Sequence, residues 1–176
     1  MVIVVRYWWC SLISRARRKG NFVTTTIHNH IDIAATPDQV WEVLADLDRL
    51  HEYDPVVIRS AVVGGQHDGV GAQRRCDARQ GRYFVETVTE WDQPNRLQFT
   101  IIECNLPTRD LTHTYTLEAT PSGTRVSQLM RYDTRFGALG TLLDRVMIRR
   151  KTDQGIKGFL AGLNATVTNA HRSTTT

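Results

Sequence analysis

The segment from Gly137 to Thr168, GALGTLLDRVMIRRKTDQGIKGFLAGLNATVT, carries apolar residues at steps of three and four. This spacing places them on one stripe of an α-helix and does not fit the face of a strand. A helix of about thirty residues spans roughly 45 Å, enough to cross a small domain. The segment therefore predicts a long C-terminal helix around which the chain is organised. The stripe consists of Leu139, Leu142, Val146, Ile156, Leu160, Leu163 and Val167.

Two charged residues interrupt this stripe. Arg149 and Asp153 fall in its centre at about 100° per residue. Gly155, Gly158 and Gly162 fall on the opposite side of the helix. Because burying an unpaired charge is costly, two interpretations stay open. The two residues form an i,i+4 pair at the margin of the core, or they face a cavity.

Composition and charge exclude some classes of function. A chain of 176 residues fits one domain with a real core. The net charge is +4, but residues 1–20 hold five cations and no acid, which leaves 4 − 5 = −1 for residues 21–176. This near-neutral body offers no basic surface for nucleic acid. Three cysteines, at positions 10, 76 and 104, lack metal or redox spacing, which favours inert thiols in the cytoplasm.

Residues 1–20 differ in composition from the rest of the chain. An apolar, aromatic run with two tryptophans precedes a basic cluster, and it is too short to span a bilayer. The order is the reverse of a cleaved signal peptide. Residues 1–20 are therefore a disordered or over-long translated leader, or a peripheral membrane contact that would make the protein membrane-peripheral. We expect the folded domain to cover residues 21–169, followed by a polar tail at 170–176.

Further elements follow from local patterns. A β-branched run predicts a strand over Phe22–Ile33, and Thr36 followed by Pro37 predicts the start of a helix, with a second short helix around Asp46–Leu50. Period-two patterns then predict six more strands, and the short links between them imply antiparallel neighbours. These runs are Val56–Val63, Gly71–Ala78, Arg82–Trp91, Arg96–Cys104, Asp110–Ala119 and Thr124–Tyr132.

One face of the first strand gathers possible metal ligands. His28, His30 and Asp32 share that face, opposite three isoleucines. No fourth ligand is suggested nearby, so a solvated strand face is favoured over a metal site. We expect no metal and no cofactor.

The element order, together with local sequence strings, resembles the helix-grip (SRPBCC) superfamily of polyketide cyclases, START lipid-transfer domains and birch-pollen-allergen-like proteins. The resemblance covers about residues 22–168. It implies an α+β, Bet v 1-like fold: a curved seven-stranded antiparallel sheet wrapped around a long C-terminal helix, with two short helices after the first strand. The strings are Ala35–Trp41, Gly71–Arg74, Val85–Trp91, Leu106–Asp110 and Gly123–Val126.

More distantly, the chain is similar to the abscisic acid receptors of plants. In those receptors, a lysine in a string like Ile58-Arg59-Ser60 meets the acid group of the ligand, which places Arg59 in the pocket here, and a glutamate in a string like Glu86-Thr87-Val88 lines it. Two loops close over the ligand, and the matching positions are Ala78–Arg82 and Cys104–Arg109. Neither loop keeps the receptor's gate or latch sequence, so hormone reception is not implied. The expected mouth residues are Gln80, Gly81, Leu106, Pro107 and Arg109.

Strand alternation also predicts an interior that does not depend on the resemblance. Most inward positions are apolar, with a few polar groups among them, which is typical of a small-molecule site. The alternative is that each polar group satisfies a neighbour, with Glu86 and Arg59 as a buried ion pair. The candidate pocket residues are Arg59, Glu86, Val88, Phe99, His113, Tyr115, Gln128, Arg149 and Asp153.

Two classes of function follow. The favoured one is a carrier or sensor of a small hydrophobic ligand, such as a lipid, a polyketide or an aromatic acid. The other is an enzyme of the cyclase/aromatase kind, with His113 or Glu86 as base and Tyr115 as donor. No nucleophile–base–orienter set is visible in the sequence, which favours the carrier. A module that binds protein through residues 1–20 is a third interpretation, and the sequence does not indicate an oligomeric state.

Overall fold

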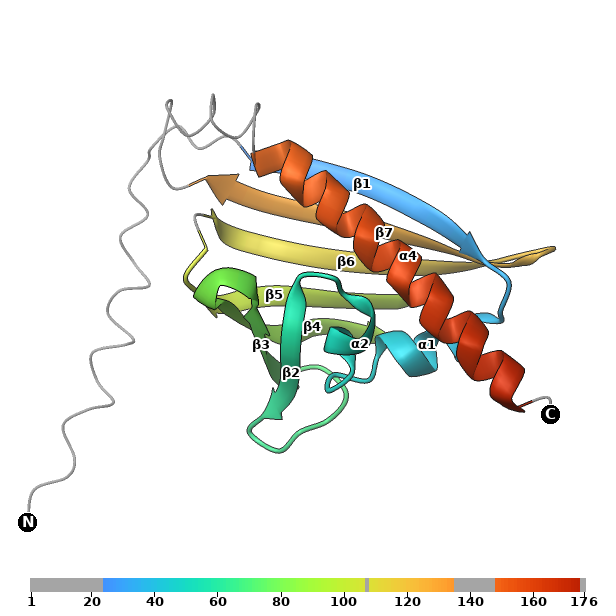
Figure 1. Ribbon diagram of the computed structural model, residues 1–176. Coiled ribbons are helices and arrows are strands. Elements are labelled where there is room, and N and C mark those ends of the chain that lie inside the picture. Colours follow the sequence, from blue (N-terminus) through green and yellow to red (C-terminus); the bar gives the residue numbers. More distant parts are fainter. Residues whose placement is uncertain (1–23, 107, 135–147, 175–176) are drawn as a thin grey trace, which may run out of the picture.

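The structure is a computed structural model that describes residues 24–106, 108–134 and 148–174 (Figure 1). Seven strands form one antiparallel sheet in the order β1-β7-β6-β5-β4-β3-β2. The α+β helix-grip fold predicted from the sequence is confirmed. The strands are β1 (Thr24–Ile33), β2 (Val57–Val63), β3 (Gln73–Ala78), β4 (Arg82–Asp92), β5 (Arg96–Cys104), β6 (Thr108–Thr120) and β7 (Gly123–Thr134). The helices are α1 (Pro37–Leu44), α2 (Leu50–Tyr53), the short 3₁₀ helix η2 (Arg79–Gly81) and α4 (Arg149–Thr174).

The long helix α4 crosses one face of the curved sheet (Figure 1). Its predicted apolar stripe is confirmed at Ile156, Leu160, Leu163 and Val167, all of which are buried, and Phe159 is buried beside them. The helix continues to Thr174, beyond its expected end at about Thr168. Its expected beginning at Gly137, with Leu139, Leu142 and Val146, lies outside the described residues. The described part of α4 therefore supplies the helix side of the core.

The glycines of α4 correct one expectation. The sequence pattern places Gly155, Gly158 and Gly162 on the side opposite the apolar stripe, but Gly158 and Gly162 pack against the segment around α2, and Gly155 lines the cavity described below. A Cβ atom added at Gly162 would overlap the carbonyl oxygen of Tyr53, and one at Gly158 would lie 2.9 Å from Cγ of Pro55. The apolar stripe alone does not reveal this second contact, because glycine carries no hydrophobic signal. The helix α4 is therefore packed on two sides, by the sheet and by the segment around α2.

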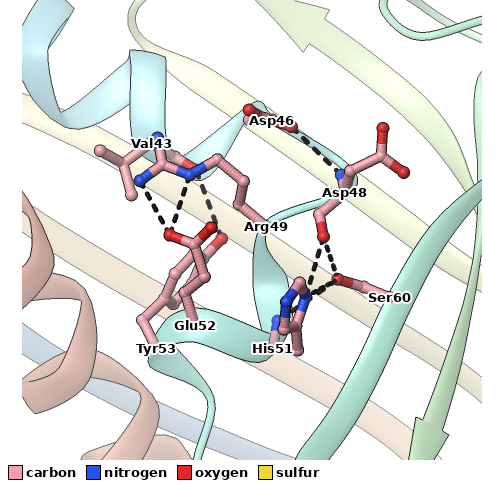
Figure 2. A network of polar contacts seen from close by, with 8 residues as sticks. All are labelled: Val43, Asp46, Asp48, Arg49, His51, Glu52, Tyr53 and Ser60. Atoms are coloured by element: carbon pink, nitrogen blue, oxygen red, sulfur yellow. Dashed lines mark hydrogen bonds and ion pairs between the residues drawn. The ribbon is translucent and has the colours of Figure 1, made fainter.

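The connection between α1 and α2 is a polar turn fastened to the edge strand β2 (Figure 2). The predicted cap of α1 is confirmed: Thr36 and Gln39 form a reciprocal capping box. The second helix begins at Leu50, later than the expected Asp46, because the carboxylate of Asp46 accepts the N–H of Asp48 and forms a turn.

Asp48 then ties this turn to β2. Its Oδ1 accepts the N–H of Val62 at 2.7 Å. Its carbonyl oxygen accepts the Ser60 hydroxyl, beside the His51 ring (Figure 2). The edge strand is thereby covered by the turn, which limits the number of backbone groups it leaves unpaired.

The outer face of β1 is polar and exposed. His28, His30 and Asp32 lie there, and Asp32 accepts two hydrogen bonds from Arg125 of β7 at 2.8 and 3.0 Å. Within residues 24–106, 108–134 and 148–174, no three potential metal ligands lie close enough to hold an ion. No helix in the same ranges is both long and apolar enough to cross a membrane. The leader proposed for residues 1–20 lies outside the described residues, so a membrane contact there stays a prediction.

Candidate functional site

A cavity of about 570 Å³ lies between the sheet and α4. Its volume falls in the range of small-molecule sites. About half of its lining residues are apolar: Leu50, Val56, Val57, Phe84, Ile101, Leu106, Leu111, Met130, Ile148, Ile156 and Phe159. The polar side chains in the lining are Asp54, Arg74, Arg82, Glu86, Thr108, His113, Tyr115, Gln128, Tyr132, Lys151 and Thr152.

A buried ion pair lies in the wall of this cavity. Arg74 of β3 and Glu86 of β4 are opposite each other in the sheet register, and Nε of Arg74 donates to Oε1 of Glu86. Their side chains are each only 3% exposed. The guanidinium group also stacks on the ring of Phe99, 4.5 Å from its centroid. Because its two opposite charges compensate each other, this pair adds little net charge to the cavity wall.

The expected partner of Glu86 was Arg59, and the structure places Arg59 elsewhere. Its side chain is exposed, outside the cavity lining. A register shift between Val57 and Arg59 breaks the alternation of β2, so that Val57 and Ser60 are the buried positions. The cation beside Glu86 is therefore Arg74. A buried pair of Glu86 with Arg59 was the alternative to a ligand-binding role for both residues, and the structure pairs Glu86 with Arg74 instead.

Three further polar side chains meet across β6 and β7. Nε2 of Gln128 lies 3.4 Å from Nδ1 of His113 and 3.4 Å from the Tyr115 hydroxyl. Burial lowers the pKa of His113, partly opposed by the nearby Glu86 carboxylate, so the ring is neutral at pH 7. Burial, reinforced by Glu86, raises the pKa of Tyr115 far above its usual value, so its hydroxyl keeps its proton. The side chains of His113, Tyr115 and Gln128 are therefore uncharged and can each form hydrogen bonds with a ligand.

Unpaired polar atoms gather in the cavity lining. Across the described residues, four buried side-chain polar atoms have no hydrogen-bond partner: Arg74 Nη1, Thr108 Oγ1, His113 Nε2 and Gln128 Oε1. All four belong to residues that line the cavity. Buried polar atoms are nearly always paired, so a cluster of unpaired ones indicates a place for polar groups of a ligand or for water.

The two loops expected at the mouth lie side by side. The side chain of Asn105 accepts the N–H of Tyr83 and donates to the carbonyl of Gly81, both at 2.9 Å. Leu106 lines the cavity, whereas Gln80 and Gly81 are exposed and lie outside the lining. Pro107 and the side chain of Arg109 lie outside the described structure. That these loops order on ligand binding stays a prediction.

Arg149 and Asp153 also differ from their expected placement. Neither lines the cavity, and Arg149 is exposed. Asp153 pairs with Lys157 at 2.7 Å and accepts the side-chain N–H of Asn29 at 2.9 Å. Lys157 thus takes the role of the i,i+4 partner, and the side of α4 that carries Asp153 meets Asn29, which lies between Ile27 and Ile31 on the inner face of β1. The cavity side of the helix instead carries Lys151, Thr152, Gly155, Ile156 and Phe159.

The remaining candidates are split between the lining and the layer behind it. Glu86, His113, Tyr115 and Gln128 line the cavity, whereas Val88 and Phe99 are buried without lining it. Sequence reasoning missed Arg74, Asp54 and Lys151, and it included Arg82 and Thr108 only as members of the expected mouth loops. A signal for Arg74 was present: it alternates with the small apolar residues Ala72 and Cys76, both fully buried, on the inward face of β3.

With this geometry in view, the family can be assigned. Residues 24–168 match the family described as "Polyketide cyclase / dehydrase and lipid transport", and the chain belongs to that family. Uncharacterized proteins of Mycobacterium tuberculosis and Mycobacterium bovis are 30% identical to it over 105 residues. These matches cover 58% of this chain and 62% of each relative, less than two thirds of their length.

Solved structures show the same fold. A protein from Thermus thermophilus is 25% identical, with a TM-score of 0.71 over 83% of this chain and 99% of its own. Ara h 8.0201 is 16% identical, with a TM-score of 0.68 over 84% and 99%. Norcoclaurine synthase from Thalictrum flavum, solved as a point mutant with a transition-state analogue, is 17% identical, with a TM-score of 0.66 over 85% and 98%. These likenesses show that the fold described above is shared with proteins of low sequence identity.

Proposed function

We propose that this chain binds and carries a small hydrophobic molecule in the cavity between the sheet and α4. The observation that carries the proposal is the composition of the cavity wall: mostly apolar surface, together with the four unpaired polar atoms of Arg74, Thr108, His113 and Gln128. An apolar concavity with a few convergent polar groups is what such ligands require.

The second candidate is an enzyme of the cyclase/aromatase kind, and one observation favours it. Nε2 of His113 is unpaired and belongs to a neutral ring in the cavity lining. Glu86 is bound by Arg74 and is not a free base, and Tyr115 keeps its proton, which suits it to donating rather than accepting. A hydroxyl that holds its proton this firmly donates a hydrogen bond but is a poor general acid, so among these three residues only His113 is left as an acid–base group. We therefore favour the carrier, and turnover of a model polyketide would support the enzyme.

Native mass spectrometry of the full chain, purified from its own host, tests the carrier proposal. We expect a stoichiometric mass excess that disappears under denaturing conditions, and an extracted molecule small enough for a cavity of about 570 Å³. Protein that carries no excess mass, and that also binds none of a panel of lipids and polycyclic aromatic compounds, would contradict the proposal.

A further inference from the structure

The charges at the inner end of the cavity restrict which polar group of a ligand can bind there. We define the inner end as Arg74, Glu86, His113, Tyr115 and Gln128, which line the cavity and form two hydrogen-bonded sets, Arg74–Glu86 and His113–Gln128–Tyr115. The Glu86 carboxylate is near enough to the second set to act on the pKa of both His113 and Tyr115. The one cation of this set, Arg74, already donates to Glu86. Asp54 adds a second carboxyl group to the same lining. The net charge of this region is therefore zero or negative, and an anionic group would find no uncompensated cation among these described residues.

The unpaired atoms at the inner end define what a ligand must supply. Nη1 of Arg74 is a donor. With the amide nitrogen of Gln128 donating to Nδ1 of His113, the neutral ring carries its proton on Nε2, which becomes a second donor, and Oε1 of Gln128 is left as an acceptor. If the amide is turned over, Nε2 of His113 becomes the acceptor and the amide the donor. In the first arrangement the amide nitrogen also donates to the Tyr115 hydroxyl, whose own proton is then a further donor. Both arrangements therefore offer at least two donors and a single acceptor.

A hydroxyl group satisfies this set by itself, because its oxygen accepts and its proton is donated. A carboxylate only accepts, so it leaves the acceptor of the His113–Gln128 pair unpaired and buries a negative charge beside Glu86. We propose that the inner end binds a neutral hydroxyl group and that the ligand is a hydrophobic alcohol or phenol rather than a carboxylic acid. This inference rests on the proposed carrier function and specifies its ligand.

The mouth of the cavity has the opposite character. Arg82 and Lys151 line it and are exposed, and they are the other two cations of the described lining. A carboxylate that enters the cavity with its apolar part first would therefore meet cations at the mouth. The test must separate this orientation from binding at the inner end.

Four fluorescent probes that share the pyrene skeleton separate the contributions of the apolar rings, an accepting oxygen, a hydroxyl proton and a negative charge. They are pyrene, 1-methoxypyrene, 1-hydroxypyrene and 1-pyrenecarboxylate, each titrated into the full chain at pH 7. We expect 1-hydroxypyrene to bind between about twofold and tenfold more tightly than 1-methoxypyrene, which cannot donate. We expect 1-pyrenecarboxylate to bind at least about tenfold more weakly than 1-hydroxypyrene. Any carboxylate binding that remains should be lost in the double variant Arg82→Gln/Lys151→Gln.

The variant Glu86→Gln provides a matched change of charge at the inner end. It keeps the size of the side chain and leaves Arg74 uncompensated, so the affinity for 1-pyrenecarboxylate should rise by at least about tenfold relative to that for 1-hydroxypyrene. Glu118→Gln makes the same change on an exposed position of β6 and should leave the order of the probes as in the wild type.

The outcomes decide between the proposals. Carboxylate binding as tight as that of 1-hydroxypyrene, which survives the double variant at the mouth, would overturn the inference and leave the carrier function standing. An unchanged order of the probes in folded Glu86→Gln would overturn it as well. If that variant does not fold, the order in the wild type decides alone. Failure of every pyrene probe to bind would remove both the inference and the carrier function on which it rests.

Discussion

Arg74 and Glu86 are each almost fully enclosed, so each depends on the other for compensation of its charge. We predict that Arg74→Met lowers the free energy of unfolding by about 3–5 kcal/mol, because it leaves the Glu86 carboxylate buried and unpaired. The double variant Arg74→Met/Glu86→Leu should recover most of this loss, because two apolar groups need no compensation. Urea titration of the two single variants and the double variant measures the coupling.

A half-exposed pair on the outer face serves as the control. Arg96 donates to Glu90 at 2.8 Å, with side chains 42% and 40% exposed. We expect Arg96→Met to change the free energy of unfolding by about 1 kcal/mol or less, because water screens such a pair. Equal losses for Arg74→Met and Arg96→Met would show that burial does not set the strength of the inner pair.

His113 should make stability depend on pH below neutrality. Burial lowers its pKa from 6.5, so in the range just below 6.5 the unfolded chain binds a proton that the folded chain does not. The free energy of unfolding therefore falls as the pH drops through this range, by up to about 1.4 kcal/mol per pH unit. His113→Phe should show a shallower slope between pH values of about 7 and 5. Parallel curves for the two proteins would contradict this account.

Within α4, two glycines should respond in opposite directions to alanine. The Cβ of Gly155→Ala meets nothing within 4 Å, so we expect the higher helix propensity of alanine to stabilise the protein by about 0.5–1 kcal/mol. Gly162→Ala places its Cβ against the carbonyl oxygen of Tyr53 and should destabilise by about 1–3 kcal/mol. Thermal or urea unfolding of both variants provides the comparison. Two stabilised variants would mean that α4 does not pack closely on α2.

The sheet shows where a sequence pattern suffices and where it fails. Alternation correctly placed Gln128 between Val126 and Met130 on the inner face, because β7 is paired along its whole length. It failed for Arg59, because a bulge that depends on pairing with β3 shifts β2. Such a shift depends on contacts between strands, and nothing in the local sequence marks it.

The cavity could be predicted in kind but not in full detail. Order and periodicity were enough to place a long helix over a curved sheet, with Glu86, His113 and Tyr115 among the residues between them. Arg74 was missed because an arginine in a strand usually lies on the exposed face. Its alternation with Ala72 and Cys76 indicates an inward position, but the carboxylate that compensates its charge, Glu86, is identified only by the pairing of β3 and β4.

At the scale of the whole molecule, we expect residues 1–20 to be dispensable for folding. Their composition breaks from the rest of the chain, and the match to the family begins at residue 24. Deleting them should lower the melting temperature by less than about 4–8 °C, the change that corresponds to roughly 1 kcal/mol in a small domain. Differential scanning calorimetry of a chain that begins at Asn21 measures this. A larger fall would show that the segment contributes to the stability of the fold.

Filling the cavity from α4 is the most direct test of ligand binding. Gly155 lies in the cavity lining, with open space where a side chain would begin. Gly155→Leu should lower the affinity for 1-hydroxypyrene by at least about tenfold without lowering the free energy of unfolding, because leucine favours the helix more than glycine does. Ala165→Leu, at an exposed position of the same helix, should bind as the wild type does. A titration in which Gly155→Leu binds 1-hydroxypyrene as tightly as the wild type would contradict the account.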